Sequence, residues 1–152
     1  MIKQVSGRTA VRLAVAASAL VLGVATASPA QAAAKVAASS DVVHSQSGKC
    51  LDGSLSQGVR LVTCDGGAYQ RWTYSGDSLV HAQSGRCLDA SVSQGVRLIV
   101  CDGGSYQKWD TNIDGELRHR QSGRCLDGSV SQGVRILACN GTSYQWWYGE
   151  IS

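Results

Sequence analysis

Short apolar runs separated by turn residues make up most of the chain after residue 40. Between Gln57-Gly58 and Gly66-Gly67, for example, the run Val59–Thr63 reads VRLVT. Runs of this length, rich in β-branched residues and bounded by glycine, predict strands rather than helices. The pattern therefore predicts an all-β domain built from many short strands.

Three copies of one unit of 27 residues carry this pattern. Gln46–Trp72 agrees with Gln83–Trp109 at 20 positions and with Gln121–Trp147 at 18, with no gap. Each copy has room for three or four short strands. A propeller is the alternative for a repeat of this size, but propellers usually need about four or more blades to close. Three copies around a threefold axis therefore fit the sequence better.

The first 32 residues have the layout of a secretory signal peptide. Met1–Arg12 holds three basic residues, Leu13–Ala27 is uncharged, and Ala30-Gln31-Ala32 is a small-residue end. The uncharged run has 15 residues, fewer than the roughly 20 that a membrane-spanning helix needs. We therefore expect cleavage after residue 32, a flexible leader at 33–40, and a secreted domain at 41–152 that does not insert into a membrane.

The charge balance narrows the range of partners. Beyond residue 32 the chain holds 11 basic and 11 acidic side chains, so the net charge of that part is near zero. A nucleic-acid-binding protein needs a basic face, and we expect no nucleic acid as partner. The chain has 18 glycines and one proline, which suits a fold with many tight turns.

Six cysteines in a small exported chain predict three disulfides. Each copy holds two cysteines 14 positions apart, so the repeat favours pairing within each copy. A metal site is the alternative, but zinc ligands usually come in closely spaced pairs, which are absent here. We expect no metal or other cofactor, and the disulfides Cys50–Cys64, Cys87–Cys101 and Cys125–Cys139.

The Cys-Leu-Asp of each copy and the Gln-x-Trp that ends it resemble the ricin B-chain type of β-trefoil lectin. Each Gln-x-Trp stands 20 residues after a Cys-Leu-Asp cysteine, at Gln70-Arg71-Trp72, Gln107-Lys108-Trp109 and Gln145-Trp146-Trp147. The resemblance covers about 41–151 and is closest to small actinohivin-like lectins, which bind high-mannose glycans. It implies a twelve-stranded β-trefoil with a barrel, a hairpin cap and one shallow sugar pocket per copy.

The resemblance makes the aspartate of each Cys-Leu-Asp the main sugar ligand, because a carboxylate accepts sugar hydroxyls through strong, charge-assisted hydrogen bonds. The alternative is a turn aspartate that bonds its own backbone. The tyrosine before each Gln lines the pocket in actinohivin-like lectins, and a core or barrel-rim position is the alternative. These candidates are Asp52, Asp89 and Asp127, with Tyr69, Tyr106 and Tyr144.

Other positions of each copy depart from the similar lectins. An arginine stands four residues before the second cysteine, where actinohivin-like lectins carry Tyr, and it either binds sugar or only neutralises the aspartate. The residue after that cysteine is Asp or Asn, against Asn in the similar lectins. Val62, Ile99 and Leu137 replace a stacking aromatic of ricin-type pockets. The additional site candidates are Arg60, Arg97 and Arg135, with Asp65, Asp102 and Asn140.

The remaining repeated residues have more structural interpretations. Gln70, Gln107 and Gln145 are included in the sugar site because they are expected to hold the pocket loop, with the aspartates as partners. Each shares a strand face with the tryptophan two residues later, and these tryptophans, Trp72, Trp109 and Trp147, are expected in the core. A threefold metal site is one interpretation of His44, His81 and His119, and strand-end histidines that bond a loop carbonyl are the favoured one.

Every candidate group is repeated three times, whereas an enzyme needs an asymmetric acid and base. Repetition suits a multivalent binder. The sequence thus predicts a secreted, monomeric lectin without enzymatic activity, with up to three sites for mannose-type or other glycans. The alternatives are a protein-binding β-trefoil, such as an inhibitor or surface interaction module with vestigial sugar pockets, an accessory domain for a plant polysaccharide, and more remotely a small glycosidase.

Overall fold

The computed structural model describes residues 39–149 of the chain. The predicted signal peptide, 1–32, and residues 33–38 of the predicted leader lie outside these residues. Ser40 already belongs to a strand, one residue before the predicted start of the domain. In the described part of the chain, no helix is long and apolar enough to cross a membrane.

Within residues 39–149, thirteen strands and three short 3-10 turns follow the three copies of the repeat. The first copy contains β1 (Ser40–Asp41), β2 (Val43–His44), β3 (Cys50–Ser54), β4 (Gly58–Val62), η1 (Ala68–Gln70) and β5 (Arg71–Ser75). The second contains β6 (Ser78–His81), β7 (Cys87–Ser91), β8 (Gly95–Ile99), η2 (Ser105–Gln107) and β9 (Trp109–Thr111). The third contains β10 (Leu117–His119), β11 (Cys125–Ser129), β12 (Gly133–Leu137), η3 (Ser143–Gln145) and β13 (Trp147–Tyr148). The predicted all-β class is confirmed, and β1 is added to the twelve strands that the resemblance implied.

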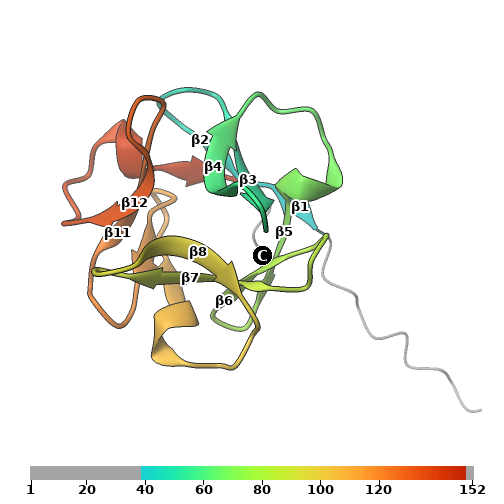
Figure 1. Ribbon diagram of the computed structural model, residues 1–152. Helices are drawn as coiled ribbons and strands as arrows, with labels where there is room; N and C mark the ends of the chain where they lie inside the picture. Colours follow the sequence, from blue (N-terminus) through green and yellow to red (C-terminus); the bar gives the residue numbers. More distant parts are fainter. Residues whose placement is uncertain (1–38, 150–152) are drawn as a thin grey trace, which may run out of the picture. The chain divides into compact units, whose positions relative to one another are not determined.

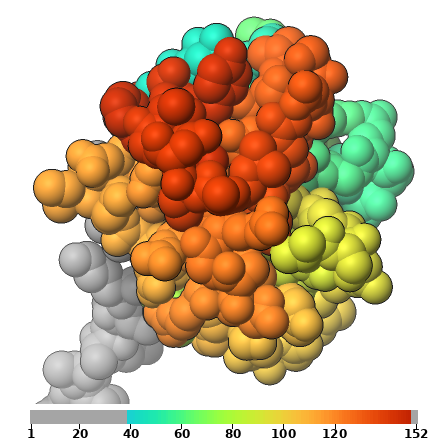
Figure 2. Space-filling model, turned by 90° about the vertical axis from the view of Figure 1, so that its left-hand side faces the viewer, coloured from blue at the N-terminus to red at the C-terminus, as the bar shows by residue number. Residues whose placement is uncertain are grey.

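Each copy contributes one hairpin, and the three hairpins are equivalent. β3–β4, β7–β8 and β11–β12 pair antiparallel with the same register. Their outer strands β4, β8 and β12 contact one another, and Figure 1 shows the three hairpins around a common centre. Figure 2 shows a face on which segments of all three copies lie side by side. The predicted threefold arrangement is therefore observed.

The other strands join consecutive copies. β5 pairs with β6, β9 with β10 and β13 with β2, in each case antiparallel. The third of these pairings sets Trp147 opposite His44 and so connects the end of the third copy to the start of the first. β1 lies against β5, with Ser40 opposite Trp72. The closed ring of paired strands and its three hairpins make this domain a β-trefoil.

The tryptophans that end the copies are core residues, as predicted. Trp72 and Trp109 are fully buried and Trp147 is 1% exposed. Each indole also donates a hydrogen bond from Nε1 to a carbonyl oxygen 21 residues earlier in the chain, which satisfies its buried N–H. The acceptors are Leu51 at 2.8 Å, Leu88 at 2.9 Å and Leu126 at 3.0 Å.

All three predicted disulfides are present, as Cys50–Cys64, Cys87–Cys101 and Cys125–Cys139. No cysteine within the described residues is free. Each bond joins the first residue of a hairpin to the loop that follows the same hairpin. The disulfide therefore holds the start of the loop that leads to the candidate tyrosine and glutamine of its copy.

Candidate functional site

The hairpin register places an arginine directly opposite each Cys-Leu-Asp aspartate. Side chains opposite each other on an antiparallel pair have Cβ atoms about 4.5–5.5 Å apart and therefore meet. The nitrogen–oxygen distances of the three ion pairs are 2.9, 2.8 and 3.0 Å in chain order. The pairs are Asp52 with Arg60, Asp89 with Arg97, and Asp127 with Arg135.

Each arginine covers the aspartate that it pairs with. The aspartate side chains are 6%, 2% and 4% exposed in chain order, and the arginine side chains are 38%, 36% and 32% exposed. At the second site, Arg97 Nε donates a hydrogen bond to Asp89 Oδ1. At the other two sites the guanidinium lies beside Oδ1 of Asp52 and Asp127 without an aligned hydrogen bond. The aspartates lie within strands and face arginines, so the turn interpretation is wrong.

The candidate tyrosines lie on the 3-10 turns and face solvent. Tyr69, Tyr106 and Tyr144 are 49%, 45% and 43% exposed, so they are not core residues. Their backbone is nevertheless held in place, because each tyrosine carbonyl oxygen accepts a hydrogen bond from a histidine of the next copy. A fixed backbone with an exposed ring is a suitable arrangement for contact with a ligand.

The histidines that hold the tyrosines are fully buried. His81 Nε2 lies 3.0 Å from the Tyr69 carbonyl oxygen, and His81 Nδ1 lies 2.8 Å from the hydroxyl of Ser84. Because a carbonyl oxygen only accepts, Nε2 carries the proton and the neutral ring accepts at Nδ1. Burial lowers the pKa of all three histidines, which favours the neutral ring.

This geometry is repeated around the domain and confirms that the histidines bond loop carbonyls. His119 contacts the Tyr106 carbonyl oxygen at 3.1 Å, and His44 contacts that of Tyr144 at 3.1 Å. Among the described residues, no cluster of three or more His, Cys, Asp or Glu side chains is arranged to hold a metal ion. The histidines therefore act as connections between copies.

The glutamines hold the loops that follow the disulfides, as predicted. Gln70 Oε1 accepts from the Asp65 backbone N–H at 2.9 Å, and its Nε2 donates to the Thr63 carbonyl oxygen at 3.0 Å. Gln107 and Gln145 make the equivalent pairs of bonds. The predicted contact with an aspartate occurs once, between Gln145 Nε2 and Asp127 Oδ2 at 3.5 Å. Since all three glutamines are buried, they support the site from beneath.

The residue after each second cysteine shapes the same loop. Its Oδ1 accepts a hydrogen bond from the backbone N–H two residues later, as in an Asx turn. All three of these side chains belong to exposed residues. The acceptor and donor pairs are Asp65 with Gly67 at 2.7 Å, Asp102 with Gly104 at 2.7 Å, and Asn140 with Thr142 at 3.1 Å.

In the third copy the candidate residues line one cavity of about 330 Å³. Asp127, Arg135, Asn140 and Tyr144 are brought together there, whereas the buried Gln145 does not line it. The sequence analysis missed the part of the wall that comes from the turn of the β11–β12 hairpin. Each copy carries Ser-x-Ser-Gln-Gly at this turn, and that repeated polar motif was the available signal. The missed residues are Ser129, Ser131 and Gln132.

A family model described as the ricin-type beta-trefoil lectin domain matches residues 38–147. The chain belongs to this family. The designed threefold-symmetric protein ThreeFoil is 30% identical to this ricin-type trefoil, with a TM-score of 0.62 over 73% of this chain and 96% of its own. The hemolytic lectin CEL-III is 28% identical, with a TM-score of 0.60 over 70% of this chain and 28% of its own.

A more distant likeness supports the fold alone. A non-toxic homologue of type II RIPs from Momordica charantia, solved in complex with alpha-methyl-D-galactoside, is 19% identical to this ricin-type trefoil. Its TM-score is 0.65, over 73% of this chain and 47% of its own. The chain thus spans less than half of this protein and of CEL-III. No curated protein matches the chain. Membership of a lectin family supports a carbohydrate-binding role.

Proposed function

We propose that this protein is a secreted lectin that binds glycans through up to three equivalent, shallow sites. One observation carries the proposal: the same aspartate–arginine pair, in the same register, lies in all three hairpins. The family membership supplies the class of ligand. The three disulfides of the domain agree with export from the cell.

Each site offers hydrogen-bonding groups of both kinds to a sugar. The arginine holds Oδ1 of the aspartate, while Oδ2 of Asp52 and Asp89 has no protein hydrogen-bond partner among the described residues. This second oxygen is available to a sugar hydroxyl, and the outer face of the guanidinium can donate to another. The arginine therefore orients the carboxylate and also contributes donors of its own.

The exposed tyrosine completes the proposed site. Its ring offers an apolar face to a pyranose, and its hydroxyl offers a polar group. In the third copy, Tyr144 and Asp127 line the same cavity, together with Leu137. The Gly-Gly-x-Tyr-Gln-x-Trp pattern supports mannose-type glycans, and other glycans remain within the proposal because Arg135 replaces the tyrosine of actinohivin-like lectins.

We further propose that the protein acts as a monomer without a cofactor, and binds rather than cleaves its ligand. Each site is shallow, so one sugar is held weakly. Three linked sites gain affinity for a branched glycan through effective concentration. The three-fold repetition of every polar group also supports binding over catalysis, because hydrolysis needs an acid and a base with different pKa values.

A glycan array probed with the protein expressed from the full chain tests this function. We expect signals from branched glycans, and their loss in the Asp52→Asn/Asp89→Asn/Asp127→Asn variant. Asp77→Asn is the matched control, because Asp77 is a surface carboxylate paired with Lys108 and Arg120 away from the hairpins. Equal signals from the triple variant and the parent would contradict the proposed sites.

A protein-binding trefoil is the second candidate, and one observation favours it. The three aspartates are almost fully buried beneath their arginines, as expected if the ion pairs are only structural. In that case the array gives no signal, and the triple variant changes only the free energy of unfolding. Signals that depend on the three aspartates decide for the lectin.

A further inference from the structure

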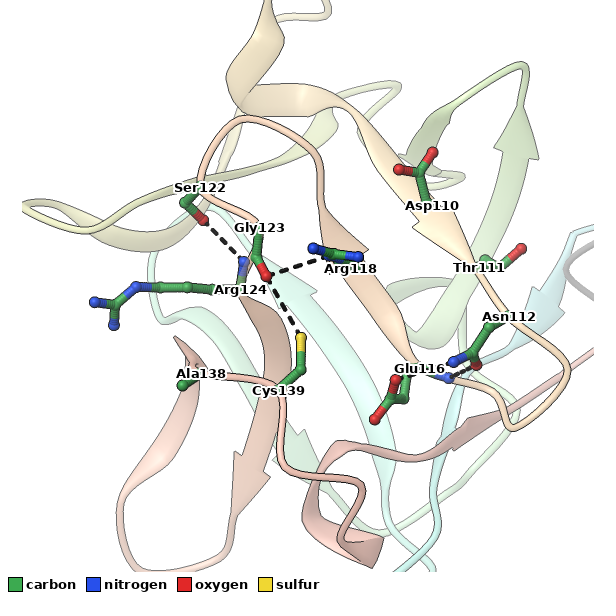
Figure 3. Close-up of a pocket in the computed structure, with 10 residues that line it drawn as sticks. All are labelled: Asp110, Thr111, Asn112, Glu116, Arg118, Ser122, Gly123, Arg124, Ala138 and Cys139. Carbon is green, nitrogen blue, oxygen red and sulfur yellow. Dashed lines mark hydrogen bonds between the residues drawn. The ribbon is translucent and has the colours of Figure 1, made fainter.

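A cleft of about 600 Å³ lies outside the three repeated sites. It opens between the β9–β10 hairpin and the segments joined by the third disulfide, as Figure 3 shows. Its volume is in the usual range of small-molecule sites, about 300–1,000 Å³. The polar side chains that line it are Asp110, Thr111, Asn112, Glu116, Arg118 and Ser122.

The threefold repeat does not account for the charges in this cleft. Asp110 stands opposite Arg118 on the paired strands β9 and β10. The equivalent cross-strand pairs are Thr73 with Val80 and Tyr148 with Val43. Two uncharged pairs therefore satisfy the same place in the fold. The charged pair is not needed to form the trefoil, and its presence in one copy points to a separate role.

Arg118 is held in position but keeps its charged end free. Its Nε donates to the Gly123 carbonyl oxygen at 3.3 Å, and a Cβ on Gly123 would lie only 3.5 Å from Nη2. Asp110 does not neutralise it, because Asp110 bonds Arg120 at 2.6 and 3.1 Å. Within residues 39–149, the two terminal nitrogens of Arg118 have no protein partner. They form a fork that matches a carboxylate.

Glu116 presents acceptor oxygens to the same cleft from a rigid turn. Asn112 Nδ2 donates to Glu116 Oε2 at 2.9 Å, and Asn112 Oδ1 accepts from the Glu116 backbone N–H at 2.8 Å. Gly115 within this turn has φ +81°, and a Cβ there would lie 2.4 Å from the Trp147 carbonyl oxygen. Only glycine fits this position. The carboxylate of Glu116 is thus oriented before a ligand arrives, and it can accept from hydroxyl groups.

We propose that this cleft binds an acidic sugar of the uronic acid type. The Arg118 fork takes the ligand carboxylate, and Glu116 accepts hydrogen bonds from ligand hydroxyls. A simple anion would satisfy the fork but would meet the negative charge of Glu116 with no donor. A neutral sugar would leave the fork unpaired. This site stands apart from the three repeated sites and does not require that they bind sugar.

Calorimetric titration of the protein expressed from the full chain tests this site. The probes are a galacturonic acid oligomer, its methyl ester and inorganic phosphate. We expect the oligomer to bind and its ester to bind at least about tenfold more weakly, because the ester cannot form the charge-assisted pair. Phosphate is expected not to compete. Equal binding of the ester, or competition by phosphate, would overturn the proposal.

Variants assign the binding to the two groups. Arg118→Val introduces the residue of both other copies and should weaken oligomer binding at least about tenfold, with Glu116→Gln weakening it independently. Arg86→Val is the matched control, because it removes one positive charge at a repeated position outside the cleft. Unchanged affinity in Arg118→Val would contradict the role of the fork, and Glu116→Gln remains as a second test if Arg118→Val fails to fold.

Amide chemical shifts of ¹⁵N-labelled protein separate this inference from the proposed lectin function. Binding in the cleft should shift Arg118 and Gly123. Shifts at Asp127 and Tyr144 instead would place the acidic sugar in the repeated site and overturn the proposal. Failure of the glycan array, by contrast, leaves the cleft result unaffected.

Discussion

His81 Nε2 donates a hydrogen bond of 3.0 Å to the carbonyl oxygen of Tyr69, across the boundary between the first two copies. A Cβ on Gly53 would lie 3.1 Å from the same histidine ring, so the ring also packs against the hairpin strand that carries Asp52. Each candidate site thus depends on the next copy for the position of its tyrosine. Stability and ligand binding should therefore be linked at the boundaries between copies.

We expect the protein to lose stability as the pH falls through the titration range of histidine. Burial lowers the pKa of His44, His81 and His119 in the folded state. The unfolded histidines, with pKa about 6.5, therefore bind protons first, and protonation favours unfolding. The stabilisation is present above the unfolded pKa and is lost as the pH falls below it. Thermal melts from about pH 7.5 to about pH 5 measure the effect.

His81→Gln is the control for this pH dependence, because glutamine cannot take up the proton. The variant should be less stable near neutral pH, and the fall in melting temperature on acidification should shrink by about a third, since one of three equivalent groups is removed. A parent melting temperature that does not change over this pH range would show that the histidines do not control acid stability.

Replacing the aspartates one at a time should remove the repeated sites one at a time. Asp→Asn keeps the size but removes the charge, and loss of a charge-assisted bond weakens a site by roughly ten- to a hundredfold. Affinity for a branched glycan should fall in steps through the single, double and triple variants of Asp52, Asp89 and Asp127, because avidity depends on sites engaged together. Calorimetry measures the steps.

Monosaccharide binding provides the comparison within the same variants. A monosaccharide should lose only stoichiometry, with the remaining sites unchanged in affinity. Thermal melts are needed beside the titrations, because each Asp→Asn change leaves a half-buried arginine without its ion pair. A folded triple variant with parental affinity would remove the aspartates from the site and leave Arg60, Arg97 and Arg135 as the candidates.

Trp109→Ala should destabilise the domain by about 3–5 kcal/mol, the usual effect of truncating a buried aromatic. The side chain is fully buried, and the variant also leaves the Leu88 carbonyl oxygen without the indole donor at 2.9 Å. Urea denaturation measures the change in free energy of unfolding. If the variant keeps the parental stability and loses only ligand binding, Trp109 belongs to the site and not to the core.

Removal of one disulfide should weaken the whole domain. Cys87→Ser/Cys101→Ser opens a loop of 15 residues, and such a cross-link is worth about 3 kcal/mol in the chain-entropy model. Denaturation under non-reducing conditions measures the loss. Peptide mapping of the parent should show no free thiol and only links within copies, and a link such as Cys64 with Cys87 would contradict the pairing.

Much of the fold was predictable because its signals are local and repeated. Turn glycines bound the strands, and cysteines 14 residues apart lie at the two ends of one hairpin unit. The predicted core tryptophans and loop-holding glutamines are likewise confirmed. The sequence analysis did not predict that Asp52 and Arg60, eight residues apart, form an ion pair, because this follows from the register of the hairpin.

The sequence by itself determined the three copies, their strands and hairpins, the disulfides and the polar groups available to each site. These features depend on residues within one copy, where alternation, turn chemistry and spacing act over short distances. Only the tertiary structure decided that the histidine of one copy bonds the tyrosine carbonyl of the copy before it. It also decided that Arg118 and Glu116 line one cleft beside the third disulfide. Such contacts depend on how paired strands bring separate segments together, and no pattern within one copy encodes that placement.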